Sequence, residues 1–182
     1  MVKAKQVGAL DIMRIGVADA LVVVDMEKDF CHRSGALLVS GVSGEPSMES
    51  VTRRIKHLAK LPFGYRAVTF DRHPISGHVE FHIYGRHVII GSSGADYVRE
   101  LEPIAGSADF RLVKGGDKAL ISHSAAVSPD WGKLIGELRE RHIQRIFVCH
   151  LRNRPGHIGK SLGWVYVRSD AVTNRKASHA GF

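Results

Sequence analysis

Cysteine is scarce in this sequence, with only Cys31 and Cys149 among 182 residues. Two cysteines so far apart do not make the disulfide framework by which small secreted domains hold themselves together. Disulfides are also rare where glutathione and thioredoxin keep thiols reduced. We therefore expect a cytoplasmic protein whose stability comes from an apolar core, which the apolar content of 44% is sufficient to build.

Long apolar runs are also missing. A membrane-spanning helix needs about 18 consecutive apolar residues, and no stretch of this chain approaches that length. The N-terminal apolar stretch is interrupted by Asp11, Arg14 and Asp19, which makes it a poor signal peptide. We expect an N-terminal extension over residues 1–19 and a single domain over residues 20–182, with no membrane partner.

Acidic residues are rare at the C-terminal end. The net charge of the chain is +8, and its last 33 residues hold six basic residues against one acidic residue, Asp170. A basic tail can bind nucleic acid. A solvated basic face gives the same composition, and no aromatic residues are interleaved in the pattern of an RNA-binding module. Nucleic acid is therefore an unlikely partner from the sequence.

Short apolar runs recur along the chain and indicate buried strands. Strands are expected at residues 21–24, 67–70, 111–114, 145–149 and 164–167. Three helices are expected between them, one after Ser47, a short one over 95–101, and one beginning at Ser128-Pro129-Asp130. Alternating strands and helices predict an α/β fold, a doubly wound three-layer sandwich with a mostly parallel sheet.

Residues with useful chemistry follow the predicted strands directly. They are Asp25, Asp71 with His73, Lys114, and Cys149. In open α/β sheets, ligands bind at this carboxyl edge. An ion pair between Asp25 and Lys114 would poise a base and stabilise developing charge.

The stretch from Asp71 to His87 is the most informative part of the sequence. It supplies one carboxylate and three imidazoles, from His73, His78 and His87, which suits zinc, iron or manganese. Chance clustering is the alternative, because the chain has 11 histidines. The proline after His73 and the glycine-rich loop around His78 favour a metal site over chance.

The ordered set of these motifs resembles the nicotinamidases of the isochorismatase-like hydrolase group. The matching stretches, which span about residues 20 to 149, are Val23-Val24-Asp25-Met26-Glu27-Lys28-Asp29-Phe30, Gly35-Ala36-Leu37, Thr69-Phe70-Asp71-Arg72-His73-Pro74, His78-Val79-Glu80-Phe81, His87 to Ala95, and Val113-Lys114-Gly115.

The resemblance implies roles for particular residues. Asp25 would be the general base and Lys114 the charge-stabilising lysine of a triad completed by a cysteine. Asp71, His73 and His87 would hold a divalent metal, with zinc ahead of iron and manganese, while His78 is a less certain fourth histidine. Phe30 is expected either to stack on the substrate ring or to be a core residue. The implied reaction is hydrolysis of nicotinamide to nicotinate and ammonia, a step of NAD salvage.

The chain departs from the family where the nucleophile belongs. The expected cysteine position falls near Pro155 or Gly156, neither of which can attack a carbonyl. Cys149 displaced into that role, with Cys31 a weaker substitute, is one explanation. A metal-binding pseudoenzyme is a second, and an altered reading of the gene from about residue 150 is a third. Glu27 also replaces a residue that in the family usually carries an amide.

Three functions therefore remain open from the sequence. The first is a metal-dependent amide hydrolase of small molecules, with a homo-oligomer as one form that it could take. The second is a non-catalytic protein of the same fold that keeps the metal. The third is a basic nucleic-acid-binding derivative.

Overall fold

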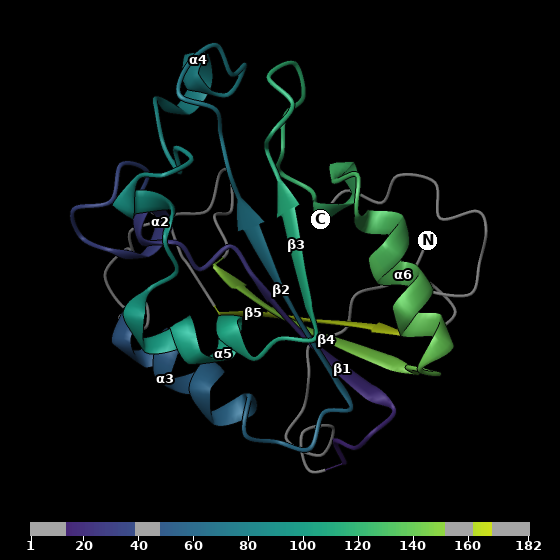
Figure 1. The fold of residues 1–182 in the computed structure, drawn as a ribbon. Helices are drawn as coiled ribbons and strands as arrows, with labels where there is room; N and C mark the ends of the chain where they lie inside the picture. Colours follow the sequence, from purple (N-terminus) through teal and green to yellow (C-terminus); the bar gives the residue numbers. More distant parts are fainter. Residues whose placement is uncertain (1–13, 39–47, 152–161, 169–182) are drawn as a thin grey trace.

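A single sheet of five strands forms the centre of the protein (Figure 1). The structure is a computed structural model that describes residues 14–38, 48–151 and 162–168. The strands lie in the order β3-β2-β1-β4-β5. Their bounds are Asp19–Val24 for β1, Tyr65–Asp71 for β2, Phe110–Lys114 for β3, Arg145–Leu151 for β4 and Leu162–Arg168 for β5. Strands β1 to β4 run parallel, and β5 pairs antiparallel with β4.

Helices cover both faces of the sheet, as the sequence predicted. On one face, α3 (Met48–Leu58) and α5 (Glu102–Gly106) pack on one apolar cluster, while α6 (Trp131–Glu140) packs on a second cluster on the other face (Figure 1). Alternate residues of a strand point to opposite faces. Accordingly, Leu21 and Val23 of β1 belong to the first cluster, whereas Ala20 and Val22 belong to the second. The three-layer α/β sandwich is confirmed.

Shorter helical elements stand between the main ones. They are α2 (Lys28–Cys31), α4 (Phe81–Tyr84) and three 3₁₀ turns, at Ser93–Ala95, Arg99–Leu101 and Ala125–Val127. Val51, Ile55 and Leu58, which recur at helical spacing in the sequence, are all buried in α3. The N-cap predicted at Ser47 lies outside the described residues.

The continuous helix predicted over 95–101 is wrong. Tyr97 and Val98 are extended instead, because Tyr97 pairs with Glu27 and the Val98 N–H donates to the Met26 carbonyl at 2.9 Å. The helix begins later, at Glu102, where Pro103 suits the first turn because it needs no intrahelical N–H bond. The turn after Ser92 forms its own backbone hydrogen bond, in which the Ala95 N–H donates to the Ser92 carbonyl.

The final predicted helix begins three residues after Ser128, at Trp131. The Ser128 hydroxyl donates to the Val113 carbonyl at 2.7 Å and accepts from the Asp130 N–H at 3.2 Å, so it joins α6 to the end of β3. Of the three apolar residues Leu134, Ile135 and Leu138 that should form the inner face of this helix, Leu134 and Leu138 are buried and Ile135 is half-buried.

Two predictions about the ends of the chain fall on residues that are not described. Residues 1–13 hold most of the predicted N-terminal extension, and residues 152–161 and 169–182 hold most of the basic tail. The domain division and a role for the tail therefore stay predictions. Among the residues that the structure describes, no helix is long and apolar enough to cross a membrane.

Candidate metal centre and active site

Four buried side chains converge at the carboxyl edge of the sheet. The ligand atoms of Asp71, His73, Glu80 and His87 all lie within 4.8 Å of one another. The His73 Nε2 is 3.2 Å from the His87 Nε2 and 3.5 Å from the Asp71 Oδ2. The Glu80 Oε2 is 3.7 Å from each of the two imidazole Nε2 atoms. This cluster contains the three metal ligands that the resemblance implied and adds a second carboxylate.

The local backbone explains how these side chains meet. Asp71 is the last residue of β2, and His73 pairs with the segment that follows His87, since its N–H donates to the Val88 carbonyl at 3.0 Å. Glu80 immediately precedes α4, whose single turn brings the chain back toward His87. The Val88 N–H in turn donates to the Asp29 carboxylate at 2.7 Å, which anchors this loop to α2.

The two histidine rings are oriented through their other nitrogen. The Nδ1 of His73 lies 3.1 Å from the Gly115 carbonyl, and the Nδ1 of His87 lies 2.8 Å from the Gly85 carbonyl. A carbonyl only accepts, so each Nδ1 carries a proton and each Nε2 faces the cluster, where it can bind a cation or take up a second proton. Metal-bound histidines are held in this way in proteins.

This donor set fits a divalent cation. Two facing imidazole lone pairs repel each other unless a proton or a cation lies between them, and here two carboxylate oxygens surround the same point. Two nitrogen and two oxygen donors suit zinc, iron or manganese. Asp71, His73, Glu80 and His87 would hold the ion, which would supply a positive centre for a pyridine nitrogen or a water molecule.

Burial and contacts within the cluster shift the pKa values of its members. Burial lowers the pKa of His73. Burial also acts to lower the pKa of His87, but hydrogen bonding to Glu80 and to the Gly85 carbonyl outweighs it and raises that pKa. Burial would raise the pKa of Glu80, but the bonds from His87 and Ser122 outweigh it and lower the pKa to about 2. Glu80 is therefore a carboxylate.

The fourth donor of the cluster is Glu80, where the sequence offered His78 as a less certain candidate. The ring of His78 stacks on that of His73, with centroids 3.9 Å apart, and its Nδ1 accepts from the Glu80 N–H at 3.3 Å. Its Nε2 is buried without a hydrogen-bond partner among the described residues. A signal for Glu80 was present, because it lies midway between His73 and His87 and carboxylates bind metals well.

A buried lysine connects this cluster to the predicted base. The Lys114 Nζ lies 3.0 Å from the Asp25 Oδ2 and 3.2 Å from the Asp71 Oδ2. Burial would lower the pKa of Lys114, but attraction to Asp25 and Asp71 outweighs it and raises the pKa. The Thr69 hydroxyl donates to the Asp25 Oδ1 at 2.6 Å and fixes that carboxylate. The predicted ion pair is present, and Asp71 is shared between lysine and cluster.

Glu27 lies at the same edge of the sheet and contacts Asp71 and Arg72. Its Oε1 accepts from the Asp71 N–H at 2.6 Å and lies 3.5 Å from the Arg72 Nη1. Its Oε2 is buried without a hydrogen-bond partner among the described residues. Burial, followed by the negative charge of the nearby Asp25, raises the pKa of Glu27 well above its ordinary value.

Neither cysteine is an accessible thiol. Strand β4 continues to Leu151, so Cys149 is an interior strand residue and not the strand end that we predicted; it lies between Val23 and Trp164 in the sheet and is fully buried. Burial raises the pKa of its thiol. Burial, together with the negative charges of Glu27 and Asp25, also raises the pKa of Cys31. The structure thus argues against Cys149 as a displaced nucleophile.

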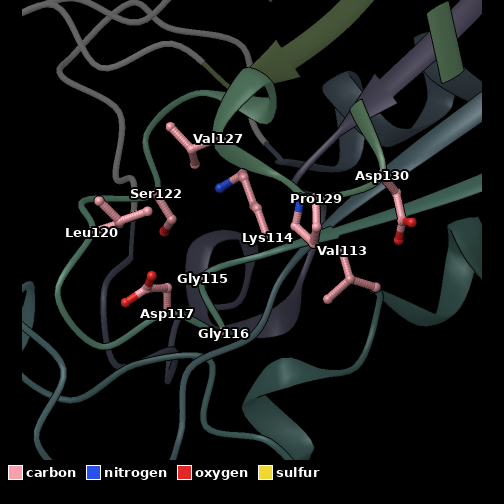
Figure 2. A pocket seen from close by; sticks show the side chains of 10 residues that line it. All are labelled: Val113, Lys114, Gly115, Gly116, Asp117, Leu120, Ser122, Val127, Pro129 and Asp130. Carbon is pink, nitrogen blue, oxygen red and sulfur yellow. The ribbon is translucent and has the colours of Figure 1, made fainter. Parts of the chain in front are cut away.

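A cavity of about 440 Å³ opens beside Lys114 (Figure 2). Figure 2 shows the amino group of Lys114 directed toward Val127 and Ser122, from the end of β3. The cavity is lined by Val113, Lys114, Gly115, Gly116, Asp117, Leu120, Ser122, Val127, Pro129 and Asp130. Phe30 does not line it. This side chain is buried in the core, with its ring centroid 5.8 Å from that of His87.

Solved structures with the same fold include nicotinamidases, pyrazinamidases and an isochorismatase-like hydrolase. The yeast nicotinamidase with bound nicotinaldehyde is 18% identical, with a TM-score of 0.61 over 74% of this chain and 75% of that one. A pyrazinamidase of Pyrococcus horikoshii in complex with zinc is 23% identical, with a TM-score of 0.56 over 74% of this chain and 71% of that one. An Acinetobacter baumannii nicotinamidase/pyrazinamidase is 26% identical, with a TM-score of 0.58 over 72% of this chain and 70% of that one.

These similarities define the class of the fold. An isochorismatase-like hydrolase from Alkaliphilus metalliredigens matches with a TM-score of 0.53 at 19% identity, over 72% of this chain and 65% of that one. No protein-family model matches the sequence, and no curated protein matches it either. The chain has the fold of the isochorismatase-like hydrolases, and the resemblance in its motifs agrees with that fold. Within that class, the solved structures that it resembles include nicotinamidases from yeast and bacteria.

Proposed function

We propose that this protein carries a nicotinamidase-type site for hydrolysis of a small aromatic carboxamide. The observation that carries the proposal is the position of Lys114, whose amino group bridges Asp25 and the metal-cluster residue Asp71. A base, a cation and a candidate metal centre are thereby connected within two short contacts. Nicotinamide, giving nicotinate and ammonia, is the substrate that the solved structures suggest, and NAD salvage in the cytoplasm is the corresponding setting.

Asp25 and Lys114 have separate roles in the proposed reaction. Asp25 Oδ2 is the base that accepts a proton from the attacking nucleophile and returns it to the departing amine. Lys114 holds that carboxylate and provides the positive charge that stabilises the anion developing as the carbonyl is attacked. In the overall reaction water adds to the carbonyl carbon, the C–N bond breaks, and ammonia leaves with the transferred proton.

A second candidate, a metal-binding protein of this fold without turnover, is favoured by the burial of both thiols. The thioester route requires a cysteine that reaches the carboxamide as thiolate. Cys31 and Cys149 are the only cysteines of the chain, and burial raises the pKa of each. A nucleic-acid-binding role and a homo-oligomer rest on no contact in the described residues and stay predictions from the sequence.

Ammonia release from nicotinamide by the purified chain, supplied in turn with zinc, iron or manganese, tests the proposal. Turnover that Asp25→Asn abolishes would support it, and wild-type rates in that variant would show that Asp25 only braces the loop. Loss of turnover in Cys149→Ala but not in Cys31→Ala would restore Cys149 as the nucleophile. No turnover with any metal, in a protein that still binds one, would establish the second candidate.

Metal content gives an independent measurement. His73→Ala removes a ligand from the centre of the cluster, so bound metal per chain should fall to near zero. His32→Ala is the matched control, since the His32 imidazole is exposed and bonds to the hydroxyl of the exposed Ser34 at 2.7 Å and to its backbone N–H at 3.3 Å. Metal content that is the same in both variants would defeat the assignment of the cluster.

A further inference from the structure

Ser122 is a buried serine that reaches both carboxylates of the cluster. It is 1% exposed, and its hydroxyl lies 2.9 Å from the Asp71 Oδ1 and 2.9 Å from the Glu80 Oε1. Its backbone N–H also donates to the Glu80 Oε1. Ser122 comes from the loop after β3, far along the chain from either carboxylate.

The oxygens that Ser122 binds are those turned away from the histidines. Asp71 offers Oδ2, its other oxygen, to the His73 Nε2 at 3.5 Å, and Glu80 offers Oε2 to both imidazoles at 3.7 Å. A carboxylate held at one oxygen by a buried donor has its second oxygen fixed in direction. The contacts of Ser122 therefore direct the two metal-facing oxygens at one point.

The loop that carries Ser122 also contacts the loop before α4 and α4 itself. The Val79 N–H donates to the Lys118 carbonyl at 2.9 Å, and the rings of Tyr84 and His123 lie 5.4 Å apart. The same loop lines the cavity beside Lys114 through Asp117, Leu120 and Ser122 (Figure 2). A wall of the cavity and the metal cluster thus meet at a single serine.

We propose that Ser122 is a positioning residue that aims Asp71 and Glu80 at the metal and couples the cavity wall to metal binding. The inference rests on the metal centre of the proposed function. Hydrogen-bond partners of metal ligands typically change metal affinity by about 10- to 100-fold when removed. The hydroxyl has one proton, so at any moment it donates to one of the two carboxylates, while the backbone N–H of Ser122 donates to Glu80 in either case. A bound cation would offset the repulsion between the two carboxylates.

Zinc affinity by competition with a chelator, and the visible absorption spectrum of the cobalt-loaded protein, test this role. Ser122→Ala should bind zinc about 10- to 100-fold more weakly and should shift the cobalt bands, which report the arrangement of the ligands. Ser124→Ala is the matched control on the same loop, because the Ser124 hydroxyl only accepts from the Ala126 N–H at 3.2 Å. Unchanged affinity and spectrum in Ser122→Ala would overturn the proposal.

Hydrogen exchange in the wild-type chain gives a second test that needs no variant. Saturating zinc should slow exchange of the Ser122 amide and of its loop, residues 117–124, because a fixed Glu80 holds that N–H. Exchange unaffected by zinc, in a protein shown to bind zinc, would overturn the coupling. A wild-type chain that binds no zinc at all would instead defeat the metal centre, so the two failures can be told apart.

Discussion

Replacing Lys114 by methionine should destabilise the protein far more than any loss of packing would suggest. Methionine keeps most of the apolar volume but removes the cation that lies 3.0 Å from Asp25 and 3.2 Å from Asp71. The side chain of Lys114 is only 2% exposed, and that of Asp71 6%, so solvent cannot replace the lost partner. The substitution leaves two carboxylates facing each other in a poorly hydrated site.

The expected magnitude follows from these exposures. Removing one partner of a buried ion pair costs about 3–5 kcal/mol. Asp25 is 22% exposed and can be partly solvated, which places the loss near the lower end, at about 3 kcal/mol. For a chain of this length, about 2–4 °C of Tm corresponds to each kcal/mol, so Tm should fall by about 6–12 °C.

Thermal and urea unfolding in the presence of a chelator would measure this loss. Lys133→Met is the matched control: Lys133 also pairs with an aspartate, Asp130, at 2.7 Å, but its side chain is 74% exposed and solvent replaces the pair. Zinc should reduce the loss in Lys114→Met, because the ion offsets the charge of Asp71. An effect of Lys114→Met no larger than that of Lys133→Met would refute the reasoning.

Two further substitutions test the frame around the cluster. Glu27→Gln should stabilise the protein, measured in the presence of a chelator, by an amount that increases with pH. The pKa of Glu27 is higher in the folded state than in the unfolded state, where it is about 4.3. The wild type therefore loses stability as pH rises from the unfolded pKa to the folded pKa, and glutamine, which does not ionise, avoids that loss. Urea unfolding from pH 5 to 8 should show a widening difference, and a constant difference would contradict it. Gly115→Ala should cost at least about 1–2 kcal/mol and weaken zinc binding, because φ is +82° there and a Cβ would strike the Asp71 carboxylate and the His73 ring. Gly116→Ala, which has open space, is its control, and equal effects in calorimetry would argue against the clash.

Much of the site is determined by sequence because parallel strands deliver their ends to one edge. The apolar runs of β1, β2 and β3 are short and continuous, and residues that follow such runs must meet wherever the strands are neighbours. The sequence alone therefore predicts that Asp25, Asp71 and Lys114 lie close together. The stretch from Asp71 to His87 offered three imidazoles, and the family resemblance selected His73 and His87 among them as metal ligands.

Tertiary structure decided the features that depend on side-chain direction within loops. His78 and Glu80 lie two residues apart, and only the turn of α4 places the carboxylate in the cluster while the imidazole stacks on His73. Ser122 reaches the same carboxylates from a distant loop, and no spacing in the sequence indicates that contact.

The same distinction applies to the thiol and to the last strand. The apolar run ending at Cys149 predicted a strand end, but β4 pairs with β1 as far as His150 and with β5 as far as Leu151, so the thiol lies inside the core. Hydrophobic runs indicate where the strands lie in the sequence, and therefore the layers of the fold. The length over which a strand pairs, and whether its neighbour runs parallel or antiparallel, depend on hydrogen bonds between the two strands. The sequence alone does not show which residues of two strands are paired.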